Sequence, residues 1–230
     1  MAPLGVDVTR VRILTAFFRA ILNLLTDRRI VGRENIPARG PYIAVANHLS
    51  TLDAPIVYDL VGGPELSGWA AEKWKHNLIY GTILRMVGSY FIQRGQVDRG
   101  GLDFAVDWLR AGHIFGMAPE GTRSRTGGLI QGKTGVAYIA DRSGAPILPI
   151  AHSGTDLVPK TLLRLRRQRI DIVIGPVFHL PPLDPDDRAA SLRRNADEVM
   201  CHLAALLPPP YRGLYAQHPR LQQLLAAGGS

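Results

Sequence analysis

The feature that most constrains the fold of this chain is the alternation of short apolar runs with helical patterns. The apolar runs are rich in β-favouring residues, as buried strands are, and they cover residues 41–46, 66–71, 87–93, 113–118, 147–150 and 170–174. Helical patterns separate most of these runs, at about 54–58, 78–86, 104–112 and 136–140. Strands that alternate with helices predict an α/β fold, with a central mostly parallel or mixed sheet flanked by helices.

Composition is typical of a folded protein with one domain. The 230 residues are 46% hydrophobic and 20% charged, which suits a substantial core and excludes an intrinsically disordered chain. We expect a single domain over residues 1–230, with the motifs in a core at about 35–180 and a helical tail at about 188–227. The part of this tail after Pro208 is expected to be peripheral. The single cysteine, Cys201, excludes an intrachain disulfide and suits a reducing compartment.

An amphipathic helix is predicted near the N-terminus, at about residues 9–27. Its apolar face carries Val11, Leu14, Phe18, Ile21, Leu22 and Leu25. The segment is too short and too charged to span a bilayer, and no signal-peptide cleavage pattern follows it. Such a helix either packs on the core or lies in a membrane surface.

The formal net charge of +8 indicates an anionic partner. The basic run at 164–169 has leucines between its charges and no aromatic residues on which bases could stack. It therefore suits an anionic bilayer better than nucleic acid. A solvated surface is the alternative for this run.

The chemistry is expected at Asn47–Asp53, which follows the run 41–46. His48 comes at the exit of the predicted strand, and Asp53 comes at the start of a helix that Ser50 or Asp53 would cap. Ligands bind at this carboxyl edge in open α/β sheets. Across a strand-turn-helix junction, a carboxylate can reach one ring nitrogen, fix the tautomer and leave the other nitrogen as a base. The alternative is that Asp53 only caps the helix and that His48 is a loop histidine.

Two arginines also stand just past predicted strands. Arg94 follows the run 87–93 and Arg123 follows the run 113–118. The planar fork of arginine matches two phosphate oxygens, although a single arginine at a strand end is often only a solvated charge. If these strands are neighbours in one sheet, both arginines converge on the edge that holds His48. Glu120 is expected to anchor one arginine or a ligand hydroxyl.

Four ordered motifs resemble the four motif blocks of the glycerolipid acyltransferases, and most of all those of the 1-acyl-glycerol-3-phosphate (lysophosphatidate) type. The motifs are Asn47-His48 with Asp53, Gly88–Arg94, Pro119–Ser124 and Ile147–Ile150. The resemblance implies transfer of a fatty acyl group from acyl-CoA or acyl-carrier protein to the free hydroxyl of a lysophospholipid, in phospholipid biosynthesis. It implies no cofactor beyond this co-substrate.

The resemblance also implies roles for individual residues. His48 would be the general base and Asp53 its orienting partner. The acceptor-phosphate site would consist of Arg94, Glu120, Gly121, Thr122 and Arg123. Lys73 resembles a basic residue that family members carry between the first two blocks. Many relatives have transmembrane segments, whereas this sequence predicts peripheral attachment at the cytoplasmic face of the membrane.

A competing motif, Gly127–Thr134, matches the phosphate-binding P-loop pattern of nucleotide hydrolases. A true P-loop leaves a strand directly, but the nearest predicted strand ends near Ala118. No later apolar strand ends in the aspartate that would hold magnesium. We therefore expect Lys133 to be a cation at a helix start, near the phosphates of the acceptor or of coenzyme A.

The sequence leaves other functions open. The acceptor could be another hydroxyl compound such as a glycolipid, or the chain could be a non-catalytic lipid-binding module. The histidines show neither His-x-x-x-His pairing nor cysteine partners, so no metal site is expected. No Gly-x-Ser-x-Gly motif supplies a nucleophilic serine. His152 is interpreted as a residue of the loop after the strand at 147–150, with a catalytic role as the alternative.

Overall fold

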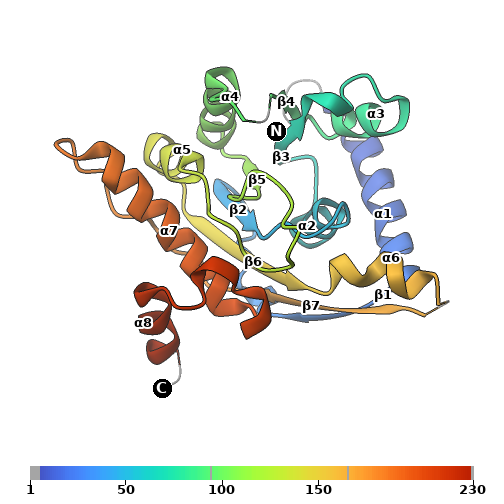
Figure 1. The fold of residues 1–230 in the computed structure, drawn as a ribbon. Coiled ribbons are helices and arrows are strands. Elements are labelled where there is room, and N and C mark those ends of the chain that lie inside the picture. The colour runs from blue at the N-terminus through green and yellow to red at the C-terminus, as the bar shows by residue number, and fades with distance from the viewer. Residues whose placement is uncertain (1–5, 94, 165, 229–230) are drawn as a thin grey trace.

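The computed structural model describes residues 6–93, 95–164 and 166–228, whose elements form three layers (Figure 1). The strands are β1 (Thr26–Val31), β2 (Tyr42–Ala46), β3 (Leu66–Ala71), β4 (Tyr90–Ile92), β5 (Ile114–Met117), β6 (Ile147–Ser153) and β7 (Gln168–Ile174). The helices are α1 (Val8–Leu25), α2 (Asp53–Val61), α3 (Leu78–Met86), α4 (Arg99–Arg110), α5 (Gly135–Ser143), α6 (Val158–Leu162), α7 (Arg188–Leu206) and α8 (Pro219–Ala227).

The strands form one mixed sheet in the order β1-β7-β6-β2-β5-β3-β4. Strands β2 to β6 run parallel to one another, whereas β7 is antiparallel to β6 and parallel to β1. The carboxyl ends of β2 to β6 therefore meet at one edge of the sheet, which is where ligands bind in such folds. This confirms the predicted α/β class with a mixed sheet.

Strand β2 lies at the centre and is buried on both faces. Its Ile43 and Val45 pack with α4, α5 and α7 on one side of the sheet. Tyr42, Ala44 and Ala46 pack with α1 and α2 on the other side. Figure 1 shows these two groups of helices on opposite sides of the strands. A strand covered on both faces reads as a continuous apolar run, which explains the strong signal at 41–46.

The N-terminal helix is confirmed, but it ends at Leu25 and the chain continues as an edge strand. Asp7 begins the helix by accepting hydrogen bonds from the amides of Thr9 and Arg10. Strand β1, which the sequence did not predict, pairs in parallel with β7. Half of its side chains are exposed, so it lacks the apolar run that marks the central strands.

Two further expectations were wrong. The strand expected at 87–93 is only Tyr90–Ile92, because Val87 terminates α3 and Gly88 turns the chain with a φ of 68°. The tail after Pro208 is not peripheral, since Tyr215 and Leu221 are buried against the core that includes α7.

No helix in the described part of the chain is both long enough and apolar enough to cross a bilayer.

Candidate active site

The loops that leave β2, β5 and β6 build the site at the shared carboxyl edge of the sheet. The first carries His48 to Asp53, the second Glu120 to Arg123, and the third leads through Gly154 into the short helical turn Thr155–Leu157. Strand β2 lies between β6 and β5, so the loop with His48 lies between the other two.

His48 and Asp53 form the pair that their spacing predicted. The His48 Nδ1 atom lies 2.8 Å from Oδ2 of Asp53. The His48 side chain is 20% exposed and the Asp53 side chain 5%. A carboxylate at Nδ1 selects the tautomer with the proton on that nitrogen, and Nε2 is then the basic atom.

Asp53 is the first residue of α2. We expected its side chain to cap this helix, but it does not. Its carboxylate turns back and accepts hydrogen bonds from the amides of Leu49 and Ser50, at 2.7 and 2.8 Å. Its other oxygen accepts from the hydroxyls of Ser50 and Thr155, at 3.1 and 2.8 Å. Burial by itself would raise the pKa of Asp53, but nearby His152 and the hydrogen bonds from His48 and the Ser50 amide hold that pKa below its ordinary value.

Glu120 joins the loop after β5 to the loop after β2. It is 1% exposed, and Oε1 accepts from the His48 amide at 2.7 Å. Oε2 accepts from the Ile130 amide at 3.1 Å. Burial raises the pKa of Glu120 above its ordinary value in spite of these two amides. The carboxylate thus positions the backbone of His48, and its expected contact with an acceptor stays a prediction.

His152 lies inside β6, not in a loop after it, and its side chain is fully buried. The Asn47 side chain bonds both backbone groups of His152, each at 2.9 Å, and so fastens the end of β2 to β6. The Nε2 atom of His152 lies 3.7 Å from Oδ1 of Asp53. No local sequence pattern indicates these contacts or Thr155, because about a hundred residues separate them from the His48 loop.

The residues that follow Glu120 are exposed in the loop next to that of His48 and Asp53. Gly121, Thr122 and Arg123 are all exposed, and Gly121 has a φ of 70° that favours glycine in this turn. A Cβ atom on Gly121 would lie 3.4 Å from Cγ of Lys133, so the Lys133 side chain passes beside this turn. The structure therefore brings Lys133 to the Glu120–Arg123 loop.

Of the other two predicted cations, only Lys73 belongs to the described part of the chain. Arg94 lies outside the described residues. The strand before it, β4, is the edge strand next to β3 and is not a neighbour of β2 or β5. Lys73 is exposed in the turn that follows β3, with its Nζ 5.0 Å from the ring centre of Trp74.

A cavity of about 190 Å³ opens beside His48 and Asp53. Its wall is mostly apolar and comes from β2, α2, β3, α3 and β5, with Gly121 at one end. Gly68 shapes this wall, because a Cβ atom there would lie 2.5 Å from the carbonyl oxygen of Gly116. The site thus combines the His48–Asp53 pair with space for an apolar group.

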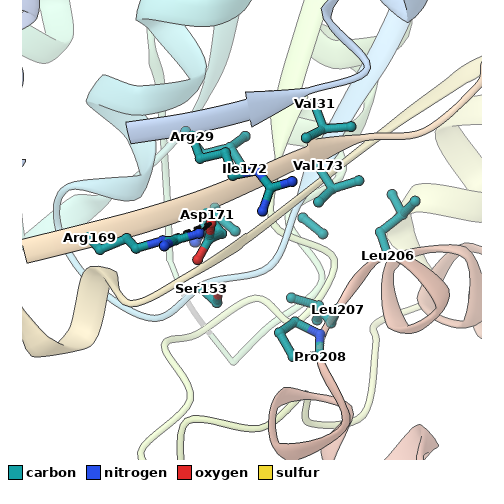
Figure 2. Close-up of a pocket in the computed structure, with 12 residues that line it drawn as sticks. Arg29, Val31, Ser153, Arg169, Asp171, Ile172, Val173, Leu206, Leu207 and Pro208 are labelled. Carbon is teal, nitrogen blue, oxygen red and sulfur yellow. Dashed lines mark hydrogen bonds and ion pairs between the residues drawn. The ribbon is translucent and has the colours of Figure 1, made fainter. Parts of the chain in front are cut away.

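A second cavity, of about 450 Å³, lies over β1 and β7 near the end of α7 (Figure 2). Arg29, Arg169, Asp171 and Ser153 line it together with Leu206 and Pro208. His152 also lines it, but none of His48, Asp53, Glu120, Gly121, Thr122, Arg123, Lys73 and Lys133 does. We therefore place the chemistry at the smaller cavity, which holds the His48–Asp53 pair.

The P-loop interpretation does not fit the structure. The segment that matches the pattern follows a loop rather than a strand, since β5 ends at Met117. Its amides are used within the protein: those of Leu129 and Ile130 donate to Tyr211 and Glu120, and those of Gly132 and Lys133 donate to Tyr215 and Pro119. A P-loop instead directs these amides at phosphate oxygens.

Among the described residues, no three or more His, Cys, Asp and Glu side chains are grouped as a metal site would require.

The family model described as "Acyltransferase" matches residues 27–153, which is more than half of the chain and contains His48, Asp53 and Glu120. A 1-acyl-sn-glycerol-3-phosphate acyltransferase from Salmonella typhimurium is 30% identical over 73% of this chain. The chain belongs to the acyltransferase family.

Other members of this family are similar over shorter or comparable parts. A 1-acyl-sn-glycerol-3-phosphate acyltransferase from Saccharomyces cerevisiae is 33% identical over 58% of the chain. The match spans 45% of the yeast protein and 66% of the Salmonella protein. The crystal structure of the 1-acyl-sn-glycerophosphate acyltransferase from Thermotoga maritima matches with a TM-score of 0.64 and 27% identity, over 82% of this chain and 76% of that one.

The contacts of Glu120 predict a loss of stability in the Glu120→Gln protein. The amide that replaces one carboxylate oxygen would face a backbone N–H, and a hydrogen bond to a charged group is worth about 1.5–3 kcal/mol. We expect the free energy of unfolding in urea to fall by about 2 kcal/mol. Arg123→Ala, at an exposed position in the same loop, is the control and should change it by less than about 0.5 kcal/mol. Equal stability of both proteins would contradict this role of Glu120.

Proposed function

We propose that this chain transfers a fatty acyl group to the free hydroxyl of 1-acyl-glycerol-3-phosphate or a related lysophospholipid. The donor is acyl-CoA or acyl-carrier protein. The observation that carries the proposal is the His48–Asp53 pair, at 2.8 Å, in the lining of a mostly apolar cavity in a member of the acyltransferase family.

His48 acts as the general base in this proposal. An alcohol is a weak nucleophile until its proton is removed, and Nε2 of His48 takes that proton as the oxygen attacks the thioester carbonyl. Asp53 holds the ring in the required tautomer and stabilises the imidazolium that forms. The thiol leaves as the acyl ester forms, and the transfer needs no cofactor because the thioester is already activated.

The apolar cavity binds an acyl chain next to this base. Its lining includes Val57, Leu66, Leu84, Ile92 and Met117. Burying each methylene group in such a cavity contributes about 0.8 kcal/mol. An acyl chain bound there would place its ester or thioester end near His48.

Exposed cations beside the mouth bind the anionic parts of the substrates. Arg123 and Lys133 belong to the group around Gly121, which itself lines the cavity. Arg94 and Lys73 complete the proposed phosphate-binding set. We assign the phosphate of the acceptor to Arg123, because a guanidinium can bind two phosphate oxygens at once.

Two alternatives use the same site. Transfer to another hydroxyl acceptor, such as a glycolipid, needs the base and the cavity but not the phosphate contact. A lipid-binding module would need the cavity alone. The directed contact between Asp53 and the His48 ring, together with the buried donors behind Asp53, favours catalysis.

Loss of the base should stop the reaction without unfolding the protein. We expect His48→Ala to lower kcat by about 10²–10⁴-fold, the usual contribution of a general base. Free thiol release from acyl-CoA in the presence of 1-acyl-glycerol-3-phosphate measures the rate. The exposed His179 provides the matched control, His179→Ala, which should keep the wild-type rate. A His48→Ala protein with wild-type turnover would show that another residue is the base.

The phosphate contact should appear in the acceptor kinetics. Arg123→Ala should raise KM for 1-acyl-glycerol-3-phosphate about tenfold to a hundredfold, because a charge-assisted hydrogen bond is lost. KM for acyl-CoA should change little. Arg125, another exposed arginine of the same loop, gives the control Arg125→Ala. If only KM for acyl-CoA rises, Arg123 binds the donor and the proposed map of the substrates is reversed.

We also propose peripheral attachment to an anionic membrane at the cytoplasmic face. Helix α1 buries Val11 and Leu22 against the protein but leaves Ile13, Phe17 and Leu24 exposed. Helix α3 likewise exposes Leu78 and Ile79. These residues are accompanied by exposed basic side chains at Arg10, Arg12, Lys73, Lys75 and Arg85.

Internal ion pairs already neutralise part of the basic charge near α1. Arg19 and Arg28 both bind the buried carboxylate of Asp59 on α2. These two arginines therefore fasten α1 and β1 to the protein. The remaining exposed cations supply the attraction to lipid, at about 1 kcal/mol for each one near the surface.

Salt should weaken this attachment. Binding to vesicles that contain anionic phospholipid should fall as ionic strength rises, because the Debye length is about 8 Å at physiological salt. Phe17→Asp should weaken binding at every salt concentration, since it adds a charge to the exposed apolar face of α1. Leu214→Asp, at an exposed apolar position in the C-terminal segment, is the control. Salt-independent binding that is equal on neutral vesicles would contradict the electrostatic part.

A further inference from the structure

A second buried histidine lies directly behind the catalytic pair. His152 is fully buried in β6, and neither ring nitrogen has a hydrogen-bond partner among the described residues. Its Nε2 atom is 3.7 Å from Oδ1 of Asp53, the oxygen that does not bind His48. A polar group buried without a partner is costly, so this position calls for an explanation.

Packing does not explain the choice of histidine here. The neighbouring buried residues on the same face of the sheet, Ile150 and Ile172, are apolar and belong to the core formed with α1 and α2. A leucine or isoleucine could fill such a place without an unpaired polar atom. The Asn47 side chain makes two hydrogen bonds to the backbone of His152, and these hold the residue where its Nε2 atom is 3.7 Å from Oδ1 of Asp53.

The charged groups around the ring determine its protonation. Asp53 faces it from the start of α2, Asp156 from the turn after β6, and His48 from the loop after β2. Burial lowers the pKa of His152 below its ordinary value, although Asp53 and Asp156 oppose the shift. The imidazole is therefore neutral at neutral pH and carries one N–H.

We propose that His152 is a positioning residue that acts on His48 through Asp53. The neutral ring directs its Nε2–H at Oδ1 of Asp53, alongside the hydroxyl of Thr155 at 2.8 Å. This donor draws negative charge away from the oxygen that faces His48 and keeps the carboxylate oriented. His48 is then less basic and stays unprotonated, ready to accept the proton, at neutral pH.

The inference rests on the proposed acyl transfer, and kinetics test that link. His152→Leu should lower kcat about tenfold, because a hydrogen bond to a charged group is lost, and should leave both KM values unchanged. The acid limb of the kcat/KM profile should move to higher pH, since more negative charge remains on Asp53 beside His48. His152→Gln, which keeps an N–H near the same place, should restore most of the turnover. A purely structural role would lower stability and leave the acid limb where it is.

Nuclear magnetic resonance of the wild-type protein with 15N-labelled histidine tests His152 without any assay of activity. His152 should be neutral at pH 7 with its proton on Nε2, and should titrate below the ordinary value of about 6.5. His152→Leu identifies the signal, or His152→Gln does so if the leucine protein fails to fold. A proton on Nδ1 only, or a charged ring at pH 7, would overturn the inference. If the wild type transfers no acyl group, the proposed function fails, whereas these signals still decide the state of His152.

Discussion

The buried carboxylate of Asp53 is the group on which the geometry of this site depends. It accepts from five donors: the His48 ring, the amides of Leu49 and Ser50, and the hydroxyls of Ser50 and Thr155. A buried charge is stable only when it is paired in this way. Because these donors come from the loops after β2 and β6, satisfying the carboxylate also fixes both loops and the orientation of the His48 ring.

Glu120 repeats this principle on the other side of His48. Its two oxygens bind amides of the β2 loop and of the segment that leads to α5. Two buried carboxylates therefore hold the backbone and the ring of His48 from opposite sides. The exposed groups, Arg123 and Lys133, lie above this framework. The framework positions His48, the proposed base, and leaves the two cations exposed, as the proposed contact with anionic groups of substrates requires.

Apolar and charged groups lie in different parts of the site, and this separation would determine how a bound molecule is oriented. The cavity beside His48 runs between the sheet, α2 and α3, while the cations gather in the loop after β5. This arrangement is what the proposed substrates require, since they combine an apolar chain and an anionic head with a reactive group that would lie at His48. Membership of the acyltransferase family agrees with such a molecule as substrate, and the Thermotoga maritima structure shares the fold.

Local sequence pattern alone was enough to predict the α/β class, most of the strands and the pair at His48 and Asp53, because these depend on short-range periodicity and on strand-exit position. Strand β1, the buried tail around Tyr215 and the placement of His152 and Thr155 behind Asp53 were decided by the tertiary structure. Each depends on pairing between segments far apart in the chain, such as β1 with β7 or Asn47 with His152. The tertiary structure also decided the contacts of Glu120, for the same reason. Its sequence position suggests a ligand contact, whereas its burial between two loops makes it a support for His48.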